Sequence, residues 1–186
     1  MDVRMPEQNI LRRWMKRIGG PAVVVTLAVC TFLFPSHFLP QETLASCTWE
    51  VHFSPHGNFT ESIIRELNQA KSSILVQAYS FTSAPIDKAL LNAHKRGVKV
   101  EVILDKSQRT KKYSSATFLF NAGIPKKIDG RHAIAHNKVI ITDGSTVIIG
   151  SFNFTKAAEE SNAENVLVMH DKKLASLYRK NSEEHA

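Results

Sequence analysis

From residue 48 onward, segments typical of short β-strands alternate with segments typical of amphipathic helices. Residues 74–79 are a short apolar run, and in residues 98–104 apolar side chains recur at every second position, as in a strand. Residues 60–70 and 83–96 instead repeat apolar side chains at helical spacing. Strands and helices in this order require crossover connections between the strands, and therefore indicate an α/β domain.

The second half of this region continues the pattern and adds a reversal of the chain. Asp143-Gly144-Ser145 separates two apolar runs and is a strong hairpin signal. The further segments with a strand or helix pattern are residues 114–121, 134–142, 146–150, 166–169 and 172–180. Together these elements predict one α/β domain with a mixed, largely parallel sheet that is flanked by helices on both faces.

The N-terminal segment differs from the rest of the chain. Basic side chains precede an uncharged apolar run at residues 22–34, and small residues follow at 43–46. The basic side chains are Arg12, Arg13, Lys16 and Arg17. These are the parts of a secretory signal. We therefore expect residues 1–46 to direct export to the periplasm or out of the cell, and residues 47–186 to form the domain.

Two alternatives remain open for this segment. The apolar run, extended to residue 39, is nearly as long as the roughly 20 residues of a membrane span, which would make it a retained anchor. Leu44-Ala45-Ser46-Cys47 resembles a bacterial lipobox, in which Cys47 would carry a lipid. The other cysteine, Cys30, lies in the apolar run, so we expect no intrachain disulfide in the mature domain.

The charge of the chain indicates an anionic partner. Lys and Arg number 24 against 17 Asp and Glu, which gives a formal charge of +7. With 43% apolar and 22% charged residues, the chain is neither disordered nor fibrous. A basic balance suits nucleic acid or a phospholipid surface, and charge alone does not choose between them.

The residues that suggest chemistry lie between positions 136 and 164. His136 and Lys138 are two apart on a predicted strand, so their side chains leave the same face. An imidazole can act as nucleophile or general acid, and an ammonium beside it can bind a phosphate oxygen. Downstream, hydroxyl and amide donors of Ser151 and Asn153 could bind an anion, and Glu164 could orient an imidazole. Taken singly, each has an ordinary structural interpretation, such as a turn residue, a helix cap or a solvated side chain.

Taken together, these residues form a known pattern. His136-Asn137-Lys138 with Asp143, followed by Gly150-Ser151 and Asn153, resembles the motif of the phospholipase D superfamily. The similarity is greatest to its small single-motif members, which are exported bacterial endonucleases and phospholipase-D-like relatives. It extends over residues 51–171 and includes the segments 77–82, 95–98 and 151–158.

The resemblance implies a metal-independent phosphodiesterase that works through a covalent phosphohistidine. His136 would be the nucleophile or the acid, and Lys138, Ser151 and Asn153 would hold the phosphate oxygens. Glu164 would orient the histidine ring, and Asp143 would fix the motif hairpin without touching substrate. No cofactor or metal is expected, and a protonated lysine in the motif is itself no metal ligand.

The motif occurs once in the chain, whereas this mechanism needs two histidines. Of the other histidines only His170 has a lysine two residues later, Lys172, and no aspartate follows it at the motif spacing. Small members of the superfamily solve this by pairing two chains, so that two copies of the motif meet at a twofold axis. We therefore expect a homodimer with one shared active site.

Two basic clusters indicate where substrate would bind. Their members are Lys106, Arg109, Lys111, Lys112, Lys126, Lys127 and Arg131. Such clusters suit a phosphodiester backbone that is read without base specificity, although either one could also be a solvated loop. We expect a non-specific endonuclease acting on DNA, and on RNA in the same way. The alternative is a phospholipase D acting on phosphatidylcholine or cardiolipin headgroups, for example as a secreted virulence factor. A binding module without catalysis is disfavoured because the catalytic set is intact.

Overall fold

The computed structural model describes residues 47–109 and 114–185. The predicted signal or anchor at 1–46 lies outside the described residues, as do the predicted substrate residues Lys111 and Lys112. Within the part of the chain that the structure describes, no helix is both long enough and apolar enough to cross a bilayer.

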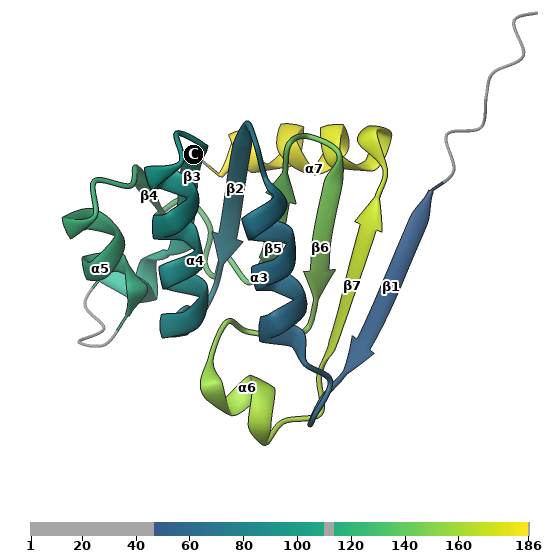
Figure 1. The fold of residues 1–186 in the computed structure, drawn as a ribbon. Helices are drawn as coiled ribbons and strands as arrows, with labels where there is room; N and C mark the ends of the chain where they lie inside the picture. Colours follow the sequence, from purple (N-terminus) through teal and green to yellow (C-terminus); the bar gives the residue numbers. More distant parts are fainter. Residues whose placement is uncertain (1–46, 110–113, 186) are drawn as a thin grey trace, which may run out of the picture. The chain divides into compact units, whose positions relative to one another are not determined.

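A seven-stranded sheet forms the centre of the described domain (Figure 1). Its strands are β1 (Thr48–Phe53), β2 (Ser73–Ala78), β3 (Lys99–Asp105), β4 (Lys126–Asp129), β5 (Lys138–Thr142), β6 (Thr146–Gly150) and β7 (Asn165–His170). The helices are α3 (Phe59–Gln69), α4 (Ala84–Lys95), α5 (Ser115–Asn121), α6 (Lys156–Glu160) and α7 (Lys172–Glu184), with a 3-10 turn η1 at Lys106–Arg109. The α/β class and the mixed sheet are confirmed.

The sheet has the order β1-β7-β6-β5-β2-β3-β4, and most of its neighbours are antiparallel. Only the pairs β2·β3 and β3·β4 are parallel. The expectation of a largely parallel sheet was therefore wrong. After β4 the chain returns to pair β5 antiparallel with β2, and the β5–β6 hairpin and β7 continue this alternation towards β1. The crossovers seen in the first half of the sequence do not continue in the second half.

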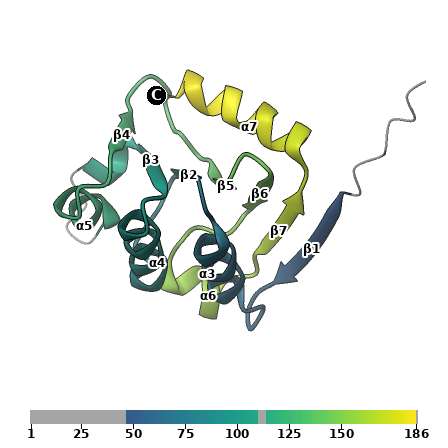
Figure 2. The same ribbon diagram turned by 45° about the horizontal axis from the view of Figure 1, so that its top comes forward.

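Helices cover both faces of the sheet, as predicted. On one face α3, α4 and α5 bury side chains such as Ile63, Leu90 and Leu119 against the strands. On the other face α7 buries Ala175 against Leu75 and Ile141. Figure 2 shows the strands lying between α3 and α4 on one side and α7 on the other. Burying apolar side chains on both faces makes the central strands β2 and β5 almost wholly inaccessible to water.

Two strands and one loop differ from what the sequence pattern suggests. Neither β1 nor β4 stands out in the sequence, because β1 is an exposed edge strand and β4 has four residues. The strand predicted over 134–142 begins only at Lys138, so residues 134–137 belong to a loop. His136 is therefore a loop residue, whereas Lys138 is the first residue of β5.

Gly150, at the end of β6, is required by a close approach of two strands. A Cβ built there would lie 2.1 Å from the carbonyl oxygen of Asn165 on β7, which is far inside van der Waals contact. By contrast, Gly130 has nothing within 4 Å of such a Cβ. Gly150 thus sets the spacing of the two strands that carry Ser151 and Asn165.

We expect Gly150→Ala to lower the free energy of unfolding by about 2 kcal/mol or more, because the added methyl must push β6 and β7 apart. Urea unfolding followed by circular dichroism measures this change. Gly130→Ala is the matched control and should change the stability by no more than about 0.5 kcal/mol. Equal effects of the two substitutions would contradict the close-approach argument.

Candidate active site

The mixed topology brings four of the predicted site residues to one edge of the sheet. β2 and β6 end at this edge and β7 begins there, at the lower edge of the sheet in Figure 1. Lys138, at the start of β5, pairs with Ala78 at the end of β2. Gly150, at the end of β6, pairs with Val166 near the start of β7. Residues 136, 138, 151 and 164 therefore come from three antiparallel strands and their flanking loops.

His136 and Lys138 form a contact pair at this edge. The His136 side chain is exposed, and its ring lies against the Tyr79 ring with 4.5 Å between centroids. The Lys138 side chain is buried, and its Nζ lies 3.1 Å from Nδ1 of His136 and 2.9 Å from the His136 carbonyl oxygen. Because an ammonium only donates, Nδ1 is the acceptor in this contact.

Burial adjusts the charge of the lysine. Removal from water lowers the pKa of Lys138, and the negative charge of Glu164 partly opposes this shift. The Lys138 ammonium also lies 5.4 Å from the centre of the Tyr79 ring, a cation–π distance. Its buried position makes Lys138 a fixed positive charge beneath an exposed imidazole.

The loop that carries His136 is held by two buried carboxylates that sequence reasoning missed. Asp105, at the end of β3, accepts a 2.8 Å hydrogen bond from the backbone N–H of Ala135. Asp129, at the end of β4, accepts from the backbone N–H groups of Arg131 and His132. Both aspartates are almost completely buried. The signal in the sequence is an aspartate at the carboxyl end of β3 and of β4.

Hydrogen bonding keeps Asp105 ionised. Burial raises the pKa of its carboxyl, but hydrogen bonds from Ser107 and Ala135 outweigh burial, so the net direction is downward. One further hydrogen bond, from the Tyr79 N–H to the Asn137 carbonyl at 2.9 Å, ties the same loop to the end of β2. The position of His136 thus depends on the ends of all three parallel strands.

The remaining predicted residues lie on the β6 and β7 side of the edge. The exposed Ser151 hydroxyl accepts from the backbone N–H of Asn165 at 3.1 Å. The side-chain oxygen of Asn153 is buried and has no hydrogen-bond partner among the described residues. Glu164 is half-buried and accepts from the Asn162 side chain at 3.0 Å. Within one chain Glu164 acts on Lys138 through its charge, and it makes no hydrogen bond to the His136 ring among the described residues.

Asp143 lies at the opposite end of β5 from Lys138. Its carboxylate accepts hydrogen bonds from the backbone N–H groups of Lys71, Ser72 and Ser73 and from the Ser72 hydroxyl, at 2.8 to 3.0 Å for the shortest contact of each. Asp143 and Gly144 both have positive φ, as a tight hairpin turn requires. This member of the motif therefore fixes the hairpin to the start of β2 and lies away from His136.

The family of this chain follows from its similarity to known proteins. A family model described as "Cardiolipin synthase, PLD-like domain" matches residues 63–186. The chain belongs to the phospholipase D superfamily.

Individual members of the superfamily are similar over most of the domain. The phospholipase D of Rickettsia felis is 46% identical over 129 residues, which are 69% of this chain and 64% of that protein. The mitochondrial cardiolipin hydrolase of Canis lupus familiaris is 34% identical over 125 residues, 67% of this chain and 49% of that protein. The chain thus spans between half and two thirds of the length of these relatives.

A solved structure of the superfamily has the same fold. The crystal structure of Nuc, a phospholipase D family member from Salmonella typhimurium, superposes with a TM-score of 0.71 at 41% identity. The match covers 75% of this chain and 93% of that chain.

Of the predicted substrate-binding residues in this superfamily member, three follow the carboxyl ends of parallel strands. Lys106 and Arg109 are in η1 directly after β3, and Arg131 follows β4. The Lys106 ammonium donates to the His132 carbonyl at 3.1 Å, and Arg131 donates to the Glu184 carbonyl at 3.3 Å. Arg109 is exposed. These side chains belong to the same carboxyl ends that hold the His136 loop.

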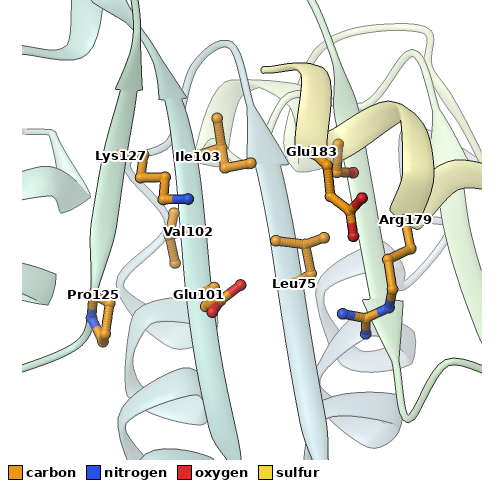
Figure 3. Close-up of a pocket in the computed structure, with 9 residues that line it drawn as sticks. Leu75, Glu101, Val102, Ile103, Pro125, Lys127, Arg179 and Glu183 are labelled. Atoms are coloured by element: carbon orange, nitrogen blue, oxygen red, sulfur yellow. The ribbon is translucent and has the colours of Figure 1, made fainter. Parts of the chain in front are cut away.

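Lys126 and Lys127, which the sequence also predicts to bind substrate, do not lie at the strand ends that hold the His136 loop. They open β4, so they are at the amino end of a parallel strand. The Lys126 ammonium donates to the Ala116 carbonyl at 2.8 Å and lies over the Phe120 ring. Lys127 lines a cavity of about 110 Å³ beside α7, together with Leu75, Glu101 and Arg179 (Figure 3).

Substituting Asp143 should affect stability in a pH-dependent way. Partial burial raises the pKa of Asp143, but its hydrogen bonds outweigh burial and lower the pKa to about 2 from the ordinary 3.8. The stabilisation is therefore complete above about pH 4 and is lost as the pH falls towards about 2. Asp143→Asn should cost about 1 to 2 kcal/mol near neutral pH, a figure reduced for exposure of the carboxylate.

The wild-type chain should consequently lose more stability than Asp143→Asn between about pH 4 and pH 2. Urea unfolding of both proteins across this range measures the difference. Parallel pH profiles would show that the carboxylate contributes nothing to the hairpin.

Proposed function

We propose that the domain is a metal-independent phosphodiesterase that acts through a covalent phosphohistidine and cleaves nucleic acid. The observation that supports this best is the contact pair at the sheet edge, in which a buried Lys138 ammonium lies 3.1 Å from the ring of an exposed His136. Phosphoryl transfer needs a nucleophile that reaches phosphorus and a fixed positive charge beside it. This pair supplies both.

The proposed reaction has two steps. In the first, a nitrogen of one imidazole bonds to phosphorus while the P–O bond to the leaving group breaks, and a second imidazole gives its proton to the leaving oxygen. In the second, a water oxygen attacks phosphorus, the N–P bond breaks, and the second imidazole takes the proton of the water. Lys138 offsets the charge on the non-bridging oxygens, and the exposed Ser151 hydroxyl lies on the same edge.

The chain carries the motif once, so we propose that a homodimer supplies the second imidazole as a second copy of His136. Among the described histidines, four have Nδ1 hydrogen-bonded elsewhere in the fold. These are His52, His132, His170 and His185. Each chain would then contribute one His136, and Glu164 would orient a ring in the assembled site.

Nucleic acid is the substrate that we favour. Lys106, Arg109 and Arg131 follow the strand ends that hold the His136 loop, and a row of cations at such a position suits a phosphate backbone. Backbone contacts of this kind carry no sequence information, so cleavage would be non-specific, and DNA and RNA would both be substrates.

Phospholipid is the second candidate, and a different observation favours it. The curated relatives carry the names phospholipase D and mitochondrial cardiolipin hydrolase. In addition, Trp49 and Phe53 on β1 are each 66% exposed, which is unusual for large apolar side chains. A headgroup phosphodiester of phosphatidylcholine or cardiolipin would react by the same steps, and such an activity would suit a secreted virulence factor.

One experiment separates the two substrates. Residues 47–186 are incubated in EDTA with supercoiled plasmid, or with vesicles that contain phosphatidylcholine or cardiolipin. We expect plasmid nicking that survives EDTA and that falls at least about 10³-fold in His136→Ala. Release of phosphatidate without plasmid nicking would refute the nuclease proposal and favour the phospholipase proposal. Activity that persists in His136→Ala would refute the phosphohistidine mechanism.

Mixing chains tests the shared site. After exchange of wild-type with an equal amount of His136→Ala, only about one quarter of the dimers contain two intact histidines. If both are needed, the activity per wild-type chain falls to about half of its unmixed value. An unchanged activity per wild-type chain, or an active monomer in sedimentation, would refute the dimeric site.

For residues 1–46 we propose an export signal that delivers the domain to the periplasm or outside the cell, with a membrane or lipid anchor as the alternative. The basic and apolar sequence of this segment supports the proposal. N-terminal sequencing of the exported protein should begin near residue 46, whereas an intact N-terminus in the membrane fraction would favour the anchor.

A further inference from the structure

A cluster of two histidines and one aspartate lies outside the proposed reaction centre. Nδ1 of His132 lies 2.8 Å from Oδ2 of Asp129, and Nδ1 of His185 lies 2.6 Å from the same oxygen. The two imidazole rings lie against each other with 4.4 Å between their centroids. The three residues come from the end of β4, the β4–β5 loop and the residue that follows α7.

The donor set of this cluster matches a transition-metal ion. Two imidazole nitrogens and one carboxylate oxygen lie within 4.8 Å of one another, and no other such group occurs among the described residues. Imidazole and carboxylate together suit Zn²⁺, whereas Ca²⁺ and Mg²⁺ prefer oxygen ligands alone. Nothing in the proposed phosphodiesterase reaction uses these side chains.

The Asp129 carboxylate is buried and fixed in its orientation, as a metal ligand would be. The Asp129 side chain is fully buried, and its Oδ2 faces the Nδ1 atoms of both histidines. Its other oxygen, Oδ1, is fixed by the backbone N–H groups of Arg131 and His132. A ligand whose second oxygen is tied to the backbone keeps its orientation, as metal ligands do.

The cluster is also open on one side. The Asp129 side chain is fully buried and that of His185 is 13% exposed, whereas that of His132 is 46% exposed. An ion can therefore enter past His132, and water can complete the coordination. With bonds of about 2.0 to 2.1 Å, ligand atoms around tetrahedral zinc are about 3.3 Å apart. The present separations of 2.8 and 2.6 Å need to open by only about 0.5 to 0.7 Å.

We propose that Asp129, His132 and His185 bind one Zn²⁺ ion through Oδ2 and the two Nδ1 atoms. The ion takes the place of the hydrogen bonds at the two Nδ1 atoms, each ring binds it as the neutral imidazole with its proton on Nε2, and no redox change is involved. It fastens the end of α7 to the loop that leads to His136, so its role is to stabilise the fold. The phosphodiesterase reaction at His136 and Lys138 remains independent of metal.

The test uses the tag-free 186-residue chain, solubilised in mild detergent and stripped with chelator. Titration with ZnCl₂ against a chromophoric competitor should show one equivalent of tightly bound zinc, and the midpoint of thermal unfolding should rise. Cobalt(II) in place of zinc should give the visible absorption of a tetrahedral site. His132→Ala and His185→Ala should each weaken zinc binding at least tenfold and abolish the thermal shift.

Two further variants serve as controls for the zinc titration. His94→Ala, on α4 and outside the cluster, should bind zinc like the wild-type chain. His185→Gln keeps a hydrogen-bond donor for Asp129 but should lose zinc, which separates metal binding from loss of the contact itself. Absence of zinc binding, or binding that the His132 and His185 substitutions leave unchanged, would overturn the proposal. Neither result would bear on EDTA-resistant cleavage at His136.

Discussion

The hydrogen bonds that Asp105 and Asp129 accept from the β4–β5 loop are the interactions on which the rest of the site depends. Parallel strands β2, β3 and β4 end at one edge of the sheet, and the chain must return across that edge before β5 can pair with β2. The loop crosses with backbone N–H groups that would be unsatisfied if they were buried without partners. Buried carboxylates at the ends of β3 and β4 accept these hydrogen bonds. The same contacts determine where His136 lies.

Much of the fold follows from the sequence because its periodicities are strong. The helices over residues 59–69 and 84–95 bury regular apolar faces, and the Asp143-Gly144 turn takes the positive φ values that its residues favour. The direction of the strands cannot be predicted from the sequence, because an apolar strand buried on both faces has the same sequence pattern in parallel and antiparallel pairs. The return after β4 is set by long-range hydrogen bonds that leave no local pattern.

The sequence likewise predicts the positions of some residues of the candidate site but not of others. His136, Lys138, Ser151 and Glu164 come to one edge because they flank strand ends that the pattern locates well. Lys126 and Lys127 are close to them in sequence, yet they begin a short parallel strand that the pattern does not show, and one of them is held by Phe120 and Ala116. A basic cluster in sequence is thus no guide to a basic surface until the strand direction is known.

The boundary between the β4–β5 loop and β5 falls between His136 and Lys138. The two residues therefore differ in how firmly the sheet holds them. Lys138 is locked into the sheet by its pairing with Ala78 and by burial, whereas His136 precedes the strand and is exposed. In the reaction that we propose, the His136 ring forms and later breaks a bond to phosphorus, so it would have to move towards and away from that atom. Because His136 precedes the first paired residue of β5, such a movement would break no pair of the sheet. The positive charge of Lys138 would stay in place while the ring of His136 moves.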